Sequence, residues 1–301
     1  MQLSRLILII VALAVALLII APIGVIVFAS VWSSFPGAPG HLTFEAFVAV
    51  LEKPSTKIEL VDTLTYGILT SILGTSIGIF FAWAVHRTDV PGRSVLNIMA
   101  ILPITLPPVV KALAMIFLFN PNIGLLNVMI GQALGTRVSI FNIYTWGGFI
   151  YATGIGMVPA AYLILSPAFS HMDPMLEEAS LSTGASKLRT FFRVTIPMLM
   201  PAILSTFFLG IIVNTGIIEY PLLIGQRAGI TSLVGAVDSA MGGTPQFNVA
   251  SSISVIFLAF AIFFLSIYVY FTRRAHRYAV IGGKGYSPKI TRLGKYRYVV
   301  L

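Results

Sequence analysis

The chain has 301 residues, of which 57% are hydrophobic and only 10% are charged, and its formal net charge is +9. Soluble domains carry about 25% charged residues, so this composition excludes an ordinary soluble protein and predicts an all-α polytopic membrane protein. The chain has no cysteine, which excludes disulfides, thiolate metal sites and cysteine nucleophiles.

Six apolar runs reach the length of about 20 residues that a transmembrane helix needs. We expect one transmembrane domain over residues 1–271, with spans at 6–32, 63–85, 94–119, 143–169, 198–220 and 251–271. The first run is longer than the roughly 7–15 apolar residues of a signal-peptide core, so we interpret it as a retained signal anchor.

The connecting segments differ in character. Residues 33–62 are polar and contain an expected amphipathic helix near 44–51, whereas the Gly- and Asn-rich residues 120–142 are expected to fold back along the membrane surface. Residues 221–250 are expected to form a loop with a short helix, and residues 272–301 form a basic tail.

Two prolines and one acidic residue within the predicted spans are candidate pathway residues. Pro107 and Pro108 predict a break in the third span. Either the backbone carbonyls that such a break leaves without partners line a pathway, or the prolines have no special role, because proline is common in membrane helices. Glu219 lies near the end of the fifth predicted span. It is either a gate or pathway residue, or an interfacial carboxylate that pairs with Lys111 or with a backbone amide near Pro221.

Charge distribution predicts the orientation. With the N-terminus inside, the inside segments hold 14 Lys and Arg residues and the outside segments hold 4. The positive-inside rule therefore predicts that both termini are cytoplasmic. The net charge then reflects topology and attraction to anionic lipid, and we expect no nucleic-acid partner.

The segment over residues 173–197, here called the elbow, reads DPMLEEASLSTGASKLRTFFRVTIP. It predicts two short helices that are capped by Asp173 and Ser186 and joined at Gly184. Its chemistry alone leaves open whether it is a solvated loop or a contact surface. The positive-inside rule places it in the cytoplasm.

The elbow contains an ordered motif. Three residues separate Glu178-Ala179-Ser180 from Gly184, and nine residues separate Gly184 from Val194-Thr195-Ile196-Pro197. This spacing resembles the E-A-A, G and I-x-L-P motif of the membrane permeases of binding-protein-dependent ABC importers, with mild substitutions at three positions.

The resemblance implies that the elbow docks as a coupling helix in a groove of a cytoplasmic ATPase. The residues that it assigns to coupling are Glu177, Glu178, Ala179, Gly184, Lys187, Leu188, Arg189 and Pro197. Leu188, Phe191 and Phe192 share one helix face, and this face either contacts the partner or packs against the permease itself.

The same resemblance implies the partners: an ATPase dimer that binds ATP and Mg²⁺, an extracytoplasmic solute-binding protein and a second permease half in the inner membrane of a prokaryote. This chain has no phosphate-binding loop of the G-x-x-x-x-G-K-[ST] type and no histidine pair with metal-ligand spacing. We therefore expect no cofactor, no metal site and no catalytic residue in it.

Residues 102–225 are similar to the ferric iron, thiamine and putrescine subgroup, so ferric iron is the expected cargo, with thiamine, putrescine or a phosphonate as alternatives. Residues 272–301 resemble the connector of two-half iron permeases. The chain is then the N-terminal half of a truncated or split tandem permease, or a six-span subunit with a basic tail.

Two other classes of function remain. An ion-coupled secondary transporter needs buried acids near the middle of the membrane, and only Glu219 comes close. An assembly or anchoring subunit would have no pathway of its own.

Overall fold

The computed structural model describes residues 2–278, and these form an all-α protein, as the composition predicted. Five of its helices are long and apolar enough to cross a membrane, and a bent pair raises the number to six. The fold class of an all-α polytopic membrane protein is therefore confirmed. The connector interpretation of the tail falls mostly outside the described residues.

The chain divides into two compact units. Unit 1 comprises Met1–Thr63 with Thr231–Ala261, and unit 2 comprises Leu64–Ile230 with Ile262–Leu301. The long helices α3 (Pro54–Arg87) and α12 (Phe247–Tyr278) contribute residues to both units.

Unit 1 contains α1 (Gln2–Ser30), α2 (Glu45–Glu52) and α11 (Leu233–Met241). The expected amphipathic helix near 44–51 corresponds to α2. The start of α11 is held by Asp62, whose carboxylate accepts hydrogen bonds from the backbone N–H and the hydroxyl of Thr231, both at 2.9 Å. These bonds satisfy polar groups at the point where the chain re-enters this unit.

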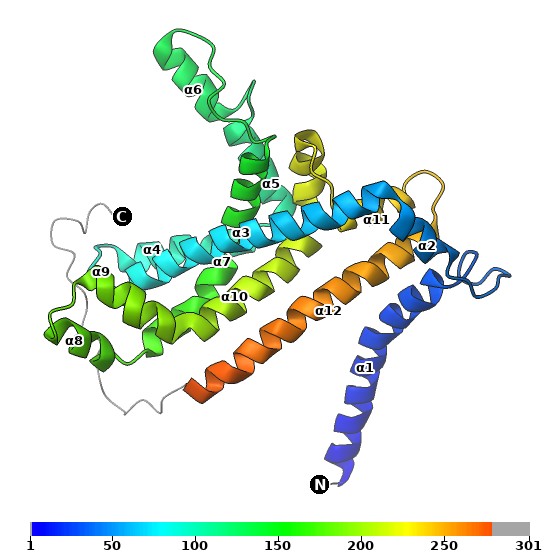
Figure 1. Cartoon of the computed structure of the whole chain (residues 1–301), viewed down its shortest axis with the longest axis horizontal. Helices are drawn as coiled ribbons and strands as arrows, with labels where there is room; N and C mark the ends of the chain where they lie inside the picture. Colours follow the sequence, from blue (N-terminus) through cyan, green and yellow to red (C-terminus); the bar gives the residue numbers. More distant parts are fainter. Residues whose placement is uncertain (1, 279–301) are drawn as a thin grey trace. The chain divides into compact units, whose positions relative to one another are not determined.

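Unit 2 is built around α7 (Trp146–His171) and α10 (Ile196–Gly216), which pack against each other. Both also pack against α3 in a buried cluster that contains Ala82, Tyr162 and Leu199 (Figure 1). Close approach of α3 and α7 depends on glycine: a Cβ added at Gly78 would lie 2.7 Å from the Cβ of Ala161. An amide of Asn214 on α10 donates to the hydroxyl of Thr70 on α3 at 3.0 Å. Small residues and interhelical polar bonds are typical of packed membrane helices.

The third predicted span is two helices, α4 (Arg93–Ile101) and α5 (Pro108–Phe119), with the 3₁₀ turn Leu102–Thr105 between them. The axes of the two parts differ by 110°. Pro107 supplies the carbonyl that accepts from the N–H groups of Val110 and Lys111. Pro108 occupies the first helical position, where its missing N–H leaves no bond unmade. The break predicted from the prolines is therefore present.

The segment that follows α5 folds as a hairpin around helix α6 (Leu125–Leu134). The side-chain amide of Asn127 is buried and donates to the carbonyls of Asn120 and Phe141. Its oxygen accepts from the backbone N–H groups of Ile140 and Phe141. One side chain thus joins the two arms of this hairpin.

Candidate functional site: the elbow

The elbow begins at the end of α7 and consists of α8 (Met175–Ser182), the short helix α9 (Lys187–Thr190) and a π-helical turn, η2 (Phe191–Thr195), that runs into α10. The carboxylate of Asp173 accepts from the backbone N–H of Met175 at 2.9 Å. The hydroxyl of Ser186 accepts from the backbone N–H of Arg189 at 3.3 Å. Ser186 therefore caps the second helix as the sequence predicted, whereas the N-cap residue of the first helix is Pro174 and Asp173 bonds the first helical N–H from one position earlier.

The reversal between α8 and α9 depends on Gly184, whose φ is +85°. The N–H of Gly184 donates to the carbonyl of Leu181, and the N–H of Ala185 donates to the carbonyl of Ser180. These bonds occupy carbonyls at the end of α8 in the manner of a glycine-terminated helix. The hydroxyls of Ser180 and Thr190 lie 3.0 Å apart and join the two arms. The elbow is thus a closed turn with its own internal bonds.

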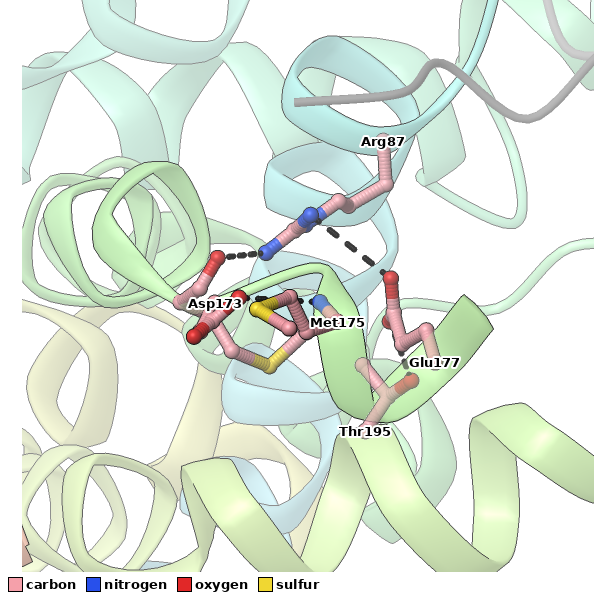
Figure 2. Close-up of polar contacts among 6 residues, drawn as sticks. Arg87, Asp173, Met175, Glu177 and Thr195 are labelled. Carbon is pink, nitrogen blue, oxygen red and sulfur yellow. Dashed lines mark hydrogen bonds and ion pairs between the residues drawn. The ribbon is translucent and has the colours of Figure 1, made fainter. Parts of the chain in front are cut away.

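The first elbow helix is also joined to the end of α3, through the side chain of Arg87 (Figure 2). The guanidinium Nη2 donates to the carbonyl of Met172 at 2.6 Å, and Nη1 lies 3.6 Å from a carboxylate oxygen of Glu177. The other oxygen of Glu177 accepts from the hydroxyl of Thr195 at 2.5 Å. We call these four residues the Arg87 cluster.

The charged side chains of the Arg87 cluster are largely buried, unlike the side chains on the outer face of the elbow. The side chain of Arg87 is 2% exposed and that of Glu177 is 18% exposed. Glu177, which the motif assigned to coupling, therefore lies against α3 and η2, and the structure places it as an internal contact of the permease.

The outer face of the elbow presents large apolar side chains. Leu188 is 69% exposed and Phe192 is 61% exposed, whereas Phe191 packs edge-to-face on Trp83 with ring centroids 5.8 Å apart. The sequence left the direction of these three side chains open. The structure turns Phe191 inward and leaves the other two on the surface, where an apolar contact with a partner is possible.

A polar pocket of about 360 Å³ lies in the bend of the elbow. Its lining residues are Ser180, Thr183, Gly184, Ala185, Arg189 and Arg193. Among the coupling residues assigned by the motif, Gly184 and Arg189 thus share one concave surface. Ala179, Lys187 and Pro197 are exposed, and Glu178 is partly buried.

The candidate pathway residues lie away from the elbow. Pro107 and Pro108 are at the α4–α5 break. Helix α10 ends at Gly216, so Glu219 falls in the next helical segment, directly before the π-helical turn Pro221–Gly225. The fifth helix is therefore shorter at this end than the expected span 198–220. Within the described residues, Glu219 and Lys111 form no ion pair within 4 Å.

Two residues that make contacts in this site were not predicted from the sequence. Arg87 was interpreted as one of the charges that set topology, and Thr195 was assigned no role. A basic residue at the end of a membrane span is expected for orientation alone, so its sequence position carries no signal of the contact with Glu177.

Comparison with known proteins agrees with this geometry. The family model described as "Binding-protein-dependent transport system inner membrane component" matches residues 74–277. The chain is 28% identical over 165 residues to the sulfate transport system permease protein CysT of Salmonella typhimurium, an alignment that covers 55% of this chain and 57% of CysT. It is 25% identical over 239 residues to the ferric transport system permease protein FbpB of Actinobacillus pleuropneumoniae, covering 78% of this chain and 34% of FbpB.

Similarity extends to the molybdenum transport system permease protein ModB of Escherichia coli, with 31% identity over 45% of this chain and 57% of ModB. The alignments thus span about half the length of CysT and ModB and about a third of FbpB. A solved bacterial ABC transporter involved in the import of the acidic polysaccharide alginate has a chain of the same fold, with a TM-score of 0.67, 18% identity, and coverage of 90% of this chain and 95% of that chain.

Proposed function

Because the chain belongs to the family of binding-protein-dependent transport system inner membrane components, we propose that it is the permease of an ATP-driven importer. Its elbow docks on a cytoplasmic ATPase that this chain lacks. The chain contributes half of a translocation pathway, and a second permease half contributes the rest. ATP and Mg²⁺ bind to the ATPase and not to this chain.

The observation that carries the proposal is the build of the elbow. Closure of an ATPase dimer can move a permease only through an element that transmits displacement, and a freely mobile loop would absorb it. The elbow has a capped second helix, a glycine-terminated turn, a hydroxyl contact across its two arms and the buried Arg87 contact to α3. At the same time Leu188 and Phe192 remain exposed on its outer face.

The positive-inside rule supports the orientation in which the elbow and both termini are cytoplasmic. A solute-binding protein then delivers cargo to the opposite face. One structural neighbour is a bacterial alginate ABC transporter in complex with a periplasmic protein bound to an alginate pentasaccharide. A partner of that kind is what we propose here.

Ferric iron is the cargo we propose, because residues 102–225 resemble iron-type permeases and FbpB aligns over the largest share of this chain among the relatives described above. CysT and ModB are named for sulfate and molybdenum, so an oxyanion is the second candidate. Thiamine, putrescine and a phosphonate are further alternatives.

The test is co-purification of the chain with a co-expressed ABC-type ATPase of its source organism, followed by ATP hydrolysis and uptake in liposomes. We expect a stable complex whose hydrolysis rises when a loaded binding protein is added. Glu178→Lys should abolish complex formation or transport while membrane insertion is retained. Normal ATP-dependent uptake by that variant would contradict the docking proposal, and uptake driven by a proton or sodium gradient without any ATPase would favour a secondary transporter.

A further inference from the structure

The end of α3 has no covalent connection to the elbow, yet two side chains join them. Trp83 makes the apolar contact with Phe191 described above, and Arg87 makes the polar one. Arg87 reaches the carbonyl of Met172, at the end of α7, and the carboxylate of Glu177, on α8. Through Thr195, Glu177 also contacts the turn that leads into α10. One arginine therefore lies where α3, α7 and the turn that leads into α10 meet the elbow.

The placement of Arg87 is costly unless its charge is neutralised. A guanidinium carries five N–H donors and remains charged at any relevant pH. In this cluster Nη2 is hydrogen-bonded, whereas Nε and Nη1 are buried with no hydrogen-bond partner in the described structure. The carboxylate of Glu177, 3.6 Å from Nη1, supplies the opposite charge in direct reach. Loss of that charge would leave the buried guanidinium with only the weaker Coulombic contribution of Asp173.

We propose that Arg87 is a positioning residue that holds α8 at a set orientation to α3 through Glu177. A displacement of the elbow is then transmitted directly to α3 as well as to α7 and α10. The role of Arg87 in transport rests on the proposed function, but the positional role is a property of this chain alone. The two covalent connections of the elbow reach α7 and α10, and the Arg87 cluster adds α3.

The geometry explains why an arginine and a glutamate are suited to this task. The planar fork of the guanidinium presents separate nitrogens to the carbonyl of Met172 and to Glu177, which a single lysine ammonium cannot reproduce in the same geometry. Glu177 divides its two oxygens between Arg87 and Thr195. The orientation of the glutamate is therefore determined from two sides.

Because the chain contains no cysteine, the proposal can be tested with spin labels at two introduced cysteines. Suitable sites are Gly147 on α7, where an added Cβ meets only the Thr145 hydroxyl at 4.0 Å, and the exposed Ser182 at the end of α8. Gly147 lies 24 residues before the end of α7 at His171, a rise of about 36 Å, and this rise sets the order of the distance between the labels. Pulsed electron paramagnetic resonance on the purified full chain in nanodiscs measures this distance.

With Arg87 and Glu177 intact, we expect one narrow distance peak. Arg87→Gln and Glu177→Gln should each lose that peak and give a broad or multiple distribution, and the double variant should be no broader than either single one, because both remove the same contact. Arg93→Gln, which changes an exposed arginine at the start of α4, is the matched control and should keep the narrow peak.

Glu177→Gln is the decisive variant, because it keeps the shape of the side chain and the bond with Thr195 even where Arg87→Gln fails to fold. A narrow, unshifted peak in Glu177→Gln would overturn the proposal. The measurement uses no ATPase, so it separates this inference from the proposed function. Failure of the ATPase to co-purify would refute docking and leave the positional role of Arg87 standing.

Discussion

Substitution of Gly184 tests the backbone of the elbow in isolation from its side-chain contacts. The φ of Gly184 is +85°, and a Cβ added there meets no atom within 4 Å. The effect of Gly184→Ala therefore contains no steric clash and consists of left-handed backbone strain, about 1–2 kcal/mol. If docking requires this conformation, the apparent affinity for the ATPase falls by about 5- to 30-fold.

The affinity is measured by titrating the nanodisc-embedded permease with the co-purified ATPase. Gly184→Asn should weaken binding less than Gly184→Ala, since asparagine tolerates the left-handed region, and Gly184→Pro should abolish binding because proline requires a negative φ. Gly216→Ala is the control: its added Cβ also meets no atom within 4 Å, but its φ is not positive. Equal affinities for the Gly184→Ala variant and the unsubstituted chain would refute the reasoning.

Three further substitutions test other parts of the structure. Gly78→Ala places a Cβ 2.7 Å from that of Ala161 and should destabilise the bundle by about 1–3 kcal/mol, seen as a lower thermal unfolding midpoint; an unchanged midpoint would contradict the close approach of α3 and α7. Asn127→Ala removes four of the hydrogen bonds that join the arms of the α6 hairpin and should accelerate hydrogen exchange over residues 120–143; protection equal to that of the parent would show that these four bonds are dispensable. Leu188→Asp, at a 69% exposed position, should weaken ATPase binding and leave the thermal midpoint unchanged; a large loss of stability would instead place Leu188 in internal packing.

Local features of this fold could be predicted from the sequence, because their causes are local. The proline pair Pro107-Pro108 predicted the break between α4 and α5. Gly184 and Ser186 predicted the reversal and the second helix start of the elbow. In each of these cases the identity of one or two residues restricts the backbone at their own positions.

The rest depended on contacts between distant positions. Arg87 and Glu177 are 90 positions apart, and no periodicity connects a charge at a span end with an acid in a later loop. The end of α10 was also missed, because the apolar run continues through Ile217 and Ile218 although the helix stops at Gly216. Hydropathy averages over a window and does not report a change of backbone direction inside an apolar run.

The hydrogen bonds of the α6 hairpin indicate where this permease can accept inserted residues. The bonds that join its arms come from the amide of Asn127 and from the N–H of Ile143, which donates to the carbonyl of Phe119. The turn after Gly135 adds to α6 the bond from the N–H of Thr136 to the carbonyl of Gly131. Surface turns of this kind tolerate changes of length at a small cost in loop-closure entropy. Insertions would accumulate there during divergence without disturbing the bundle, and the same turn is a suitable place to insert an epitope or a fluorescent reporter.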